Sequence, residues 1–332
     1  MTDELDLETV PRYLSQQRLL ALAELAHVEE LTGGVSNRAF RVDWAVGGCV
    51  VKQARARLAV QMEWLADVRR VIREGEAMEW LRARLGGPHI PRLLHLDRER
   101  NLLVMEAVPR AAENYKAILL RGEVDLSLAG QFGWLLARIH NHTMDLETQR
   151  QFADATFFDQ LRLSPYYDVA AERHPRLASR IRELRRECRE SVFCLVHGDY
   201  SPKNVLVLHG KLILLDYEVA HFGNPSFDLG FALTHFLAKA LHVPGRGREF
   251  IAAARAFWDA YRRDTQVAPE AIVHAGQHLG AILLARMDGK SPLEYFTDER
   301  KKDQVREVAG RALSDDAMDI PAVIAAAEAR LL

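Results

Sequence analysis

The sequence predicts an α+β protein made of two parts: a small one on an antiparallel sheet with one long internal helix, then a larger, mostly helical one. Three observations support this division. Alternating and β-branched runs broken by Gly pairs fill residues 27–53, helical periodicity dominates from about residue 127, and short strands interrupt it at 192–215. We therefore expect an N-terminal domain over residues 1–108 and a C-terminal domain over 109–332.

In the N-terminal domain the pattern predicts elements in a simple order. An amphipathic helix over 8–25 precedes three successive antiparallel strands within 27–53, separated by Gly-containing turns. Apolar positions on a helical period then predict a helix over 60–85. The stretches RLLHLD and NLLVMEAV read as two further strands around a turn.

The C-terminal domain reads as helices around a few short strands. LSLAGQFGWLLARIHNHT predicts a helix with one apolar face. SVFCLV, VLVLH and KLILLD predict three short strands, and helical patterns resume at about residue 226.

Composition excludes several classes of function. The 332 residues carry a formal net charge of −2, which gives no general attraction to nucleic acid or to an anionic membrane. Cys49, Cys188 and Cys194 have neither metal-binding spacing nor a disulfide pattern, as expected in a reducing cytosol. The N-terminus lacks the apolar segment of a signal peptide, and no apolar run is long enough to span a bilayer. We expect a cytoplasmic protein; its oligomeric state does not follow from the sequence.

The stretch CLVHGDYSPKNVLV carries the strongest chemical signal. His197, Asp199 and Asn204 share one turn between two short strands, and Asp216 ends the next strand pair, with Glu218 two residues on. The spacing matches that of a kinase catalytic loop, H-x-D-x-x-x-x-N followed by an Asp, which supplies a base and ligands for Mg²⁺. The alternative is a polar hairpin loop that holds turn-favouring residues.

Upstream features fit the binding of a nucleotide. The turn LTGGVSN offers backbone and side-chain donors to phosphates, from Gly33, Gly34, Ser36 and Asn37. Lys52 ends a β-branched strand and is placed to hold the phosphates of a nucleotide. Its expected ion-pair partner is Glu74, with Glu76 as the alternative. The backbone from Glu106 to Val108 would bind adenine, although GTP is not excluded.

Taken together, these motifs resemble the aminoglycoside phosphotransferase and choline kinase superfamily of small-molecule kinases. LTGGVSN, VVK, VMEAVP, HGDYSPKNVLV and LLDYEVAHFGNPSFDLG follow the family order over about 200 residues. The resemblance implies a bilobal, protein-kinase-like fold. It also implies that Asp199 is the catalytic base, that Asn204 and Asp216 hold Mg²⁺ with Glu218 as an additional ligand, and that Lys52 holds ATP.

The resemblance also assigns supporting roles and a substrate class. Asp228 maps to a structural position that caps a helix and braces the catalytic loop, and His197 organises that loop. Gly198 replaces the Arg of H-R-D, DYE replaces D-F-G, and no A-P-E follows, which argues against a protein substrate.

The sequence therefore predicts an ATP- and Mg-dependent kinase that phosphorylates a hydroxyl of a small metabolite such as a sugar, an amino alcohol or an aminoglycoside-like compound. The alternative is a non-catalytic pseudokinase that binds nucleotide, which the complete set of motif residues disfavours. In the stretch ARMDGKSP, Arg286, Asp288 and Lys290 are candidates for contacting the acceptor, in a pocket for a polar or anionic metabolite. The alternative there is a helix end at which Arg286 pairs with Asp288.

Overall fold

The computed structural model divides the chain into two compact units. The first is formed by Met1–Ala112 together with Ile213–Glu218, and the second by Glu113–Leu212 together with Val219–Leu332. The segment Ile213–Glu218, which the sequence reading assigns to the C-terminal domain, thus belongs with the first unit. The structure describes residues 4–20, 25–31, 37–45, 47–55 and 66–330.

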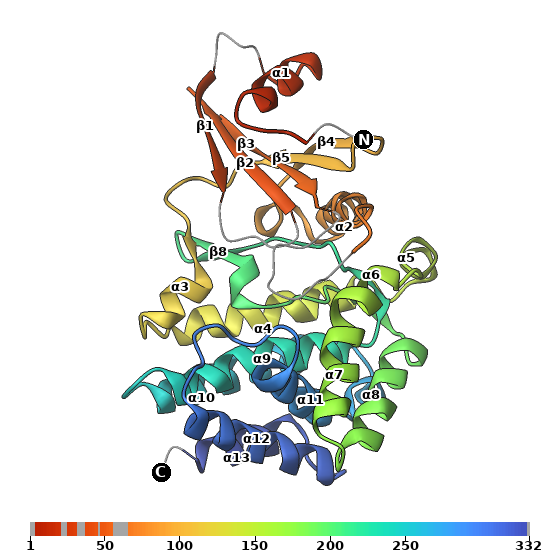
Figure 1. The fold of residues 1–332 in the computed structure, drawn as a ribbon, viewed down its shortest axis with the longest axis vertical. Helices are drawn as coiled ribbons and strands as arrows, with labels where there is room; N and C mark the ends of the chain where they lie inside the picture. Colours follow the sequence, from red (N-terminus) through yellow and green to blue (C-terminus); the bar gives the residue numbers. More distant parts are fainter. Residues whose placement is uncertain (1–3, 21–24, 32–36, 46, 56–65, 331–332) are drawn as a thin grey trace. The chain divides into compact units, whose positions relative to one another are not determined.

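The first unit is built on a five-stranded sheet in the order β1–β2–β3–β5–β4, with antiparallel neighbours throughout (Figure 1). The sequence-based expectation of three strands followed by two more is confirmed. The elements are α1 (Thr9–Gln16), β1 (Leu25–Leu31), β2 (Asn37–Trp44), β3 (Gly47–Ala54), α2 (Arg70–Leu85), η2 (Gly87–His89), β4 (Leu93–Asp97) and β5 (Leu102–Glu106).

The alternation of side chains along β3 gives the sheet two different faces. Cys49 and Val51 belong to an apolar cluster with Val10 and Leu14 of α1. Successive strand residues point to opposite faces, so Lys52 lies on the other face, with α2. The period of two therefore directs a lysine toward a helix while its neighbours fill the core.

Among the residues that the structure describes, the α-helices α1 and α2 are shorter than the periodicity predicts. The helix expected over 8–25 ends at Gln16, because the chain turns at Arg18, which has a φ of 58°. The helix expected over 60–85 begins at Arg70. Residues 56–65 lie outside the described part of the chain, and residues 68–69 form a turn that leads into α2.

The second unit is mostly helical, as expected. Its elements are β6 (Glu113–Asn114), α3 (Tyr115–Leu120), α4 (Leu126–Asn141), α5 (Leu146–Gln151), α6 (Thr156–Phe158), η3 (Asp159–Asp168), α7 (Val169–Arg173), α8 (Ala178–Glu190), β7 (Cys194–Val196), η4 (Pro202–Asn204), β8 (Val205–Leu208), β10 (His221–Gly223), α9 (Pro225–His242), α10 (Gly247–Asp264), η5 (Pro269–Ile272), α11 (Ala275–Asp288), α12 (Glu299–Ser314) and α13 (Ile320–Glu328). Strand β9 (Lys211–Leu214) begins in this unit and ends in the first.

Helix α9 forms the centre of the second unit. Every residue from Pro225 to Leu241 is buried, and α9 packs against α10 and α11, while α10 packs against α4 (Figure 1). The short strands form two small sheets, β10–β7 and β6–β8–β9. The loop after β7 is therefore held close to the most deeply buried helix of the molecule. Within the described residues, no helix has the length and apolarity needed to cross a bilayer.

The contact between α4 and α10 gives a stability test. A Cβ added at Gly133 of α4 would lie 2.0 Å from the Phe257 carbonyl oxygen of α10, whereas one at Gly130 would lie 3.9 Å from the nearest atom, the Ala256 carbonyl oxygen. We expect Gly133→Ala to lower the free energy of unfolding by at least about 1–3 kcal/mol through overpacking. Gly130→Ala should leave it unchanged or raise it by up to about 1 kcal/mol through helix propensity. Thermal melts of both variants measure this, and equal melting temperatures would show that the two helices are not in this close contact.

Candidate active site

A buried charge centre lies in the first unit around Lys52. Its ammonium donates to both carboxylate oxygens of Glu74 on α2, at 2.7 and 2.8 Å, and to Oδ1 of Asp216 at 3.1 Å. The Glu74 side chain is completely buried. Glu76, the alternative partner, instead binds Arg98 at 2.8 Å. The structure therefore pairs Lys52 with Glu74.

The charges of this centre shift the pKa values of its members. Burial opposes the charge on Lys52, but Asp216, Glu74 and Glu218 together raise the pKa of Lys52 above its ordinary value. Burial also raises the pKa of Glu74 to about 7, against the attraction of Lys52. The lysine is therefore a permanent cation in a pocket of carboxylates, which suits it to bind phosphate oxygens.

The segment that ends the first unit supplies two of these carboxylates. Asp216 has a φ of 71°, a left-handed conformation that non-glycine residues seldom adopt and that concentrates at functional sites. The carboxylate of Glu218 accepts from Arg70 at 3.2 Å and from the Asn37 side-chain amide at 3.2 Å. Arg70 is fully buried, so this ion pair anchors the segment to α2 and β2. Gly33, Gly34 and Ser36, predicted to contact nucleotide, lie outside the described residues.

The connector after β5, from Glu106 to Val108, has part of its backbone engaged in hydrogen bonds within the first unit. The Glu106 N–H donates to the Arg92 carbonyl, the Ala107 N–H donates to the Gly48 carbonyl, and the Val108 carbonyl accepts from Arg41. The three connector residues also line a cavity of about 440 Å³ in the first unit. The connector is therefore fixed in place and borders an open volume.

In the second unit, the loop after β7 is held by one carboxylate. Asp228, in the first turn of α9, accepts from the His197 N–H at 2.7 Å and from the Gly198 N–H at 2.9 Å, and it is completely buried. His140 approaches the same carboxylate at 3.6 Å. The cap of α9 is Asn224 rather than Asp228, which corrects the predicted capping role.

The loop geometry explains why glycine stands where protein kinases have arginine. Gly198 has a φ of 75°, and a Cβ there would lie 2.8 Å from a methyl group of Val219. Neither the backbone conformation nor the space admits a side chain. His197 is buried beside it, and its Nδ1 accepts from the Asp199 N–H at 3.2 Å, which fixes the turn into Asp199.

Asp199 and Asn204 are positioned by this loop. The Asn204 amide nitrogen donates to the Asp199 carbonyl at 3.0 Å, so the amide nitrogen is occupied by the loop itself. The Asp199 carboxylate pairs with Arg162 of η3 at 2.8 Å, and Arg162 also donates to the Gly198 carbonyl at 2.7 Å. Arg162 therefore fixes both the backbone and the side chain around Asp199.

Arg162 is a site residue that the sequence reading missed. It lies far upstream of Asp199 in the chain, and only the fold brings the two together. A signal is present in the stretch FFDQLRLSPYYD, where one arginine stands among aromatic and aliphatic residues. Its side chain is buried there, and buried arginines are normally paired.

The three candidate acceptor residues near the end of α11 have separate environments. Arg286 donates to the Tyr166 hydroxyl at 3.0 Å and to the Ser291 hydroxyl at 2.9 Å. Asp288 pairs with Arg306 at 2.6 Å and with His174 at 3.0 Å, so the alternative in which Asp288 pairs with Arg286 is wrong. Lys290 follows the helix and is half-buried.

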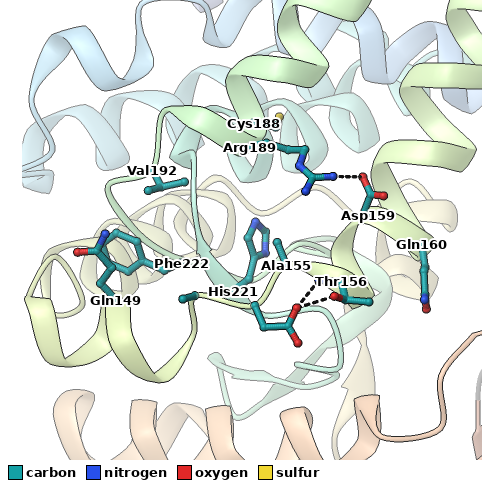
Figure 2. A pocket seen from close by; sticks show the side chains of 12 residues that line it. Gln149, Ala155, Thr156, Asp159, Gln160, Cys188, Arg189, Val192, His221 and Phe222 are labelled. Atoms are coloured by element: carbon teal, nitrogen blue, oxygen red, sulfur yellow. Dashed lines mark hydrogen bonds and ion pairs between the residues drawn. The ribbon is translucent and has the colours of Figure 1, made fainter.

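A cavity of about 570 Å³ in the second unit contains none of the predicted site residues (Figure 2). Asp159 and Arg189 line it and pair with each other at 3.4 Å, and Asp154 beside them bonds the hydroxyl of Thr156 at 2.6 Å. Because these lining groups bond one another, we assign the cavity no role in the chemistry.

Comparisons with known proteins agree with the motifs. Residues 27–271 match the model of a family described as "Phosphotransferase enzyme family". A methylthioribose kinase from Erwinia tasmaniensis is 27% identical over 281 residues, which cover 70% of this chain and 69% of that protein. The resemblance predicted from the sequence is thereby confirmed.

Solved structures share the fold at low sequence identity. A choline/ethanolamine kinase family protein from Mesorhizobium loti matches with a TM-score of 0.56 and 13% identity, over 97% of this chain and 99% of that one. An ADP-bound aminoglycoside phosphotransferase matches with a TM-score of 0.53 and 16% identity, over 95% and 100%. These matches confirm the predicted fold class.

The contribution of the Arg70–Glu218 ion pair to stability can be tested by comparing Arg70 with Arg69, the preceding residue in the sequence. We expect Arg70→Met to lower the free energy of unfolding by about 3–5 kcal/mol, because it leaves a buried carboxylate without its cation. Arg69 pairs with Asp67 but its side chain is 73% exposed, so Arg69→Met should cost less than about 1 kcal/mol. Chemical denaturation of both variants gives the comparison. A similar, small loss in each would mean that Arg70 does not anchor the segment carrying Asp216.

Proposed function

The chain belongs to the phosphotransferase enzyme family, and from this premise we propose that it is a kinase that uses ATP and Mg²⁺ to phosphorylate a hydroxyl group of a small metabolite. The observation that carries the proposal is the ion pair of Lys52 with Glu74, beside Asp216. This arrangement is the one by which kinases place a strand lysine on nucleotide phosphates and an acid on the metal. The ADP bound to the aminoglycoside phosphotransferase of similar fold supports a nucleotide as the phosphate donor.

The residues present fit Mg²⁺ held together with nucleotide phosphates. The described residues contain no set of three or more His, Cys, Asp or Glu side chains that would hold a metal by themselves. Mg²⁺ in kinases is bound through one or two carboxylates plus phosphate oxygens, so a smaller protein set suffices. When bound, the metal would neutralise charge on the phosphates.

We propose Asn204 and Asp216 as the protein ligands of this metal. The side-chain amide nitrogen of Asn204 donates to the Asp199 carbonyl, which fixes the orientation of the amide. Its side-chain oxygen is the atom that would bind the metal. Glu218, the predicted additional ligand, has its charge compensated by Arg70, which supports a role in anchoring Asp216.

For adenine, we propose recognition by the connector from Glu106 to Val108. The N–H groups of Glu106 and Ala107 are used inside the unit. This leaves the Val108 N–H, within the part of the chain that is described, as the donor to the base. Main-chain recognition of this kind requires no particular side chain.

Asp199 would act on the acceptor hydroxyl. Its carboxylate, held by Arg162, orients the hydroxyl toward the γ-phosphate and accepts its proton as the bond to phosphorus forms. Because phosphoryl transfer depends mainly on positioning and on neutralising charge, a rigid loop is the main requirement. The bonds from Asp228 and Arg162 provide that rigidity.

A metabolite screen tests the proposal. Purified protein is incubated with Mg-ATP and single candidates from the sugar, amino alcohol and aminoglycoside classes, and the ADP formed is measured. The methylthioribose kinases among its relatives support sugars as the first class to try. A folded protein that does not bind Mg-ATP would contradict the proposed function.

The role of Asp199 predicts a loss of turnover without a loss of fold. We expect Asp199→Asn to lower kcat by about 10²–10⁴-fold, because Asn is nearly isosteric but cannot accept the proton. Mg-ATP affinity should stay within a few-fold. Asp259→Asn, an exposed position on α10, is the matched control and should keep full activity. More than roughly half of the parent activity in Asp199→Asn would refute its assignment as the base.

The role of Lys52 predicts weaker nucleotide binding. We expect Lys52→Met to raise the Kd for Mg-ATP by roughly tenfold or more, the effect of losing a charge-assisted bond to phosphate. Glu74 can take up a proton when the ammonium is removed, since burial already raises its pKa, so the fold should be retained. Calorimetric titration gives the Kd, and Lys211→Met, exposed on β9, is the control. An unchanged Kd would show that Lys52 does not face the phosphates.

A further inference from the structure

Cationic side chains gather in the second unit around two aromatic residues near Asp199. Tyr166 of η3 and Tyr295, which precedes α12, each lie beneath two of them. The cations come from four different elements: Lys116 of α3, Arg162 of η3, Lys239 of α9 and Arg286 of α11.

Lys239 is the most unusual of these residues because it is completely buried. Its ammonium donates to the His235 carbonyl and to the Tyr295 hydroxyl, both at 3.3 Å, and lies 5.2 Å from the centre of the Tyr295 ring. Burial, reinforced by Lys116 and Arg286, lowers the pKa of Lys239 to about 7. A lysine with only neutral partners in such a place is costly to keep charged.

Arg286 is held in position by neutral groups. Tyr166 and Ser291 accept from its Nη1, while its buried Nε has no hydrogen-bond partner within the described chain. The fork of a guanidinium is suited to bind a carboxylate or a phosphate through two parallel bonds. The neutral contacts fix the orientation of Arg286, and the carboxylate that acts on its charge, Glu294, is bonded to Lys116 instead.

A short chain of contacts joins these cations to the proposed catalytic base. Arg162, which pairs with Asp199, lies 6.0 Å from the centre of the Tyr166 ring, and Arg286 lies 5.9 Å from the same centre. Arg162 and Tyr166 therefore stand between the Asp199 carboxylate and Arg286. Lys239 is connected to the same region through α9. The Tyr166 ring lies 5.7 Å from the ring of Phe231, and one turn later on α9 stands His235, whose carbonyl accepts from Lys239.

The nearby carboxylates do not balance these charges. Glu294 pairs with Lys116, Asp199 pairs with Arg162, and Asp288 is bound by Arg306 and His174. Among the residues that the structure describes, neither Lys239 nor Arg286 forms an ion pair with a carboxylate. The positive charge beside Asp199 therefore exceeds the negative charge, so this region favours an anion over a cation.

We infer that the acceptor phosphorylated by this enzyme carries an anionic group, a carboxylate or a phosphate, and that Arg286 binds this group with Lys239 behind it. The inference rests on the proposed kinase function and specifies its substrate class. An anion would supply the countercharge that Lys239 and Arg286 lack. Arg286 and Arg162 both lie against the Tyr166 ring, and Arg162 holds Asp199. An acceptor whose anionic group is bound by Arg286 would therefore have its hydroxyl group placed toward Asp199.

The first test compares acceptors that share hydroxyl groups but differ in charge. We propose to measure kcat/KM for ribose, ribonate and ribose 5-phosphate, and for glycerol, glycerate and glycerol 3-phosphate. The anionic members should exceed their neutral partners by tenfold or more, and the better anion identifies carboxylate or phosphate. A preference for the neutral members would overturn the inference and leave the kinase function standing.

Variants test the two cations directly. Arg286→Met and Lys239→Met should each lower kcat/KM for the preferred anionic acceptor by roughly tenfold to a hundredfold, the effect of a lost charge-assisted bond. The KM for ATP should not change. Arg263→Met, at an exposed position on α10, is the control. If Lys239 is only a neutral structural residue, its Met variant will retain the full preference for the anion, which contradicts the role given to it.

A binding measurement separates this inference from the kinase function. Inorganic sulfate stabilises many proteins in a general way, so its effect on the melting temperature is compared between the parent, Arg263→Met and the two test variants. We expect a larger rise in the parent and the control than in Arg286→Met and Lys239→Met. Equal rises in all four proteins would overturn the anion site. If the folded protein does not bind Mg-ATP but this difference is present, the kinase function fails and the anion site stands.

Discussion

The carboxylate of Asp228 is the constraint on which the proposed catalytic loop depends. It is buried in the first turn of the central helix and accepts from two successive backbone N–H groups, of His197 and Gly198. A buried carboxylate without such donors would be strongly destabilising, so loop and helix stabilise each other. This attachment holds the backbone at the left-handed turn of Gly198, and the bond from the Asp199 N–H to His197 fixes the turn into Asp199.

The two units differ in the groups that surround their buried cations. In the first, Lys52 is surrounded by carboxylates that keep it charged, and Arg70 compensates Glu218. In the second, Arg286 and Lys239 are held by hydroxyl and carbonyl groups. Under the proposed function, the carboxylates of the first unit would accept a metal that arrives with the nucleotide. The inferred excess of positive charge in the second unit would select among acceptors by their charge.

Local patterns allowed much of this molecule to be predicted, and non-local contacts account for what was missed. The strands of the first sheet follow from alternation, and the spacing from His197 to Asn204 is contained in one turn. Helix ends were less predictable, because α1 ends at Gln16 where the chain turns through the left-handed Arg18, and periodicity does not show this turn. Arg162 escaped notice since its partner Asp199 is distant in the sequence. The pairing of Asp288 with Arg306 depends on the packing of α12 against α11.

The division of the chain also bears on how the protein is made. The chain passes between the two units three times, after Ala112, after Leu212 and after Glu218. The first unit therefore lacks Asp216 and Glu218 until two thirds of the polypeptide has been synthesised. A nascent chain that ends before this point would have to bury Arg70 without its carboxylate, so the N-terminal sheet is not expected to mature first on the ribosome, as N-terminal domains often do. The same segment makes the first unit a poor candidate for transfer to another protein as a continuous fragment.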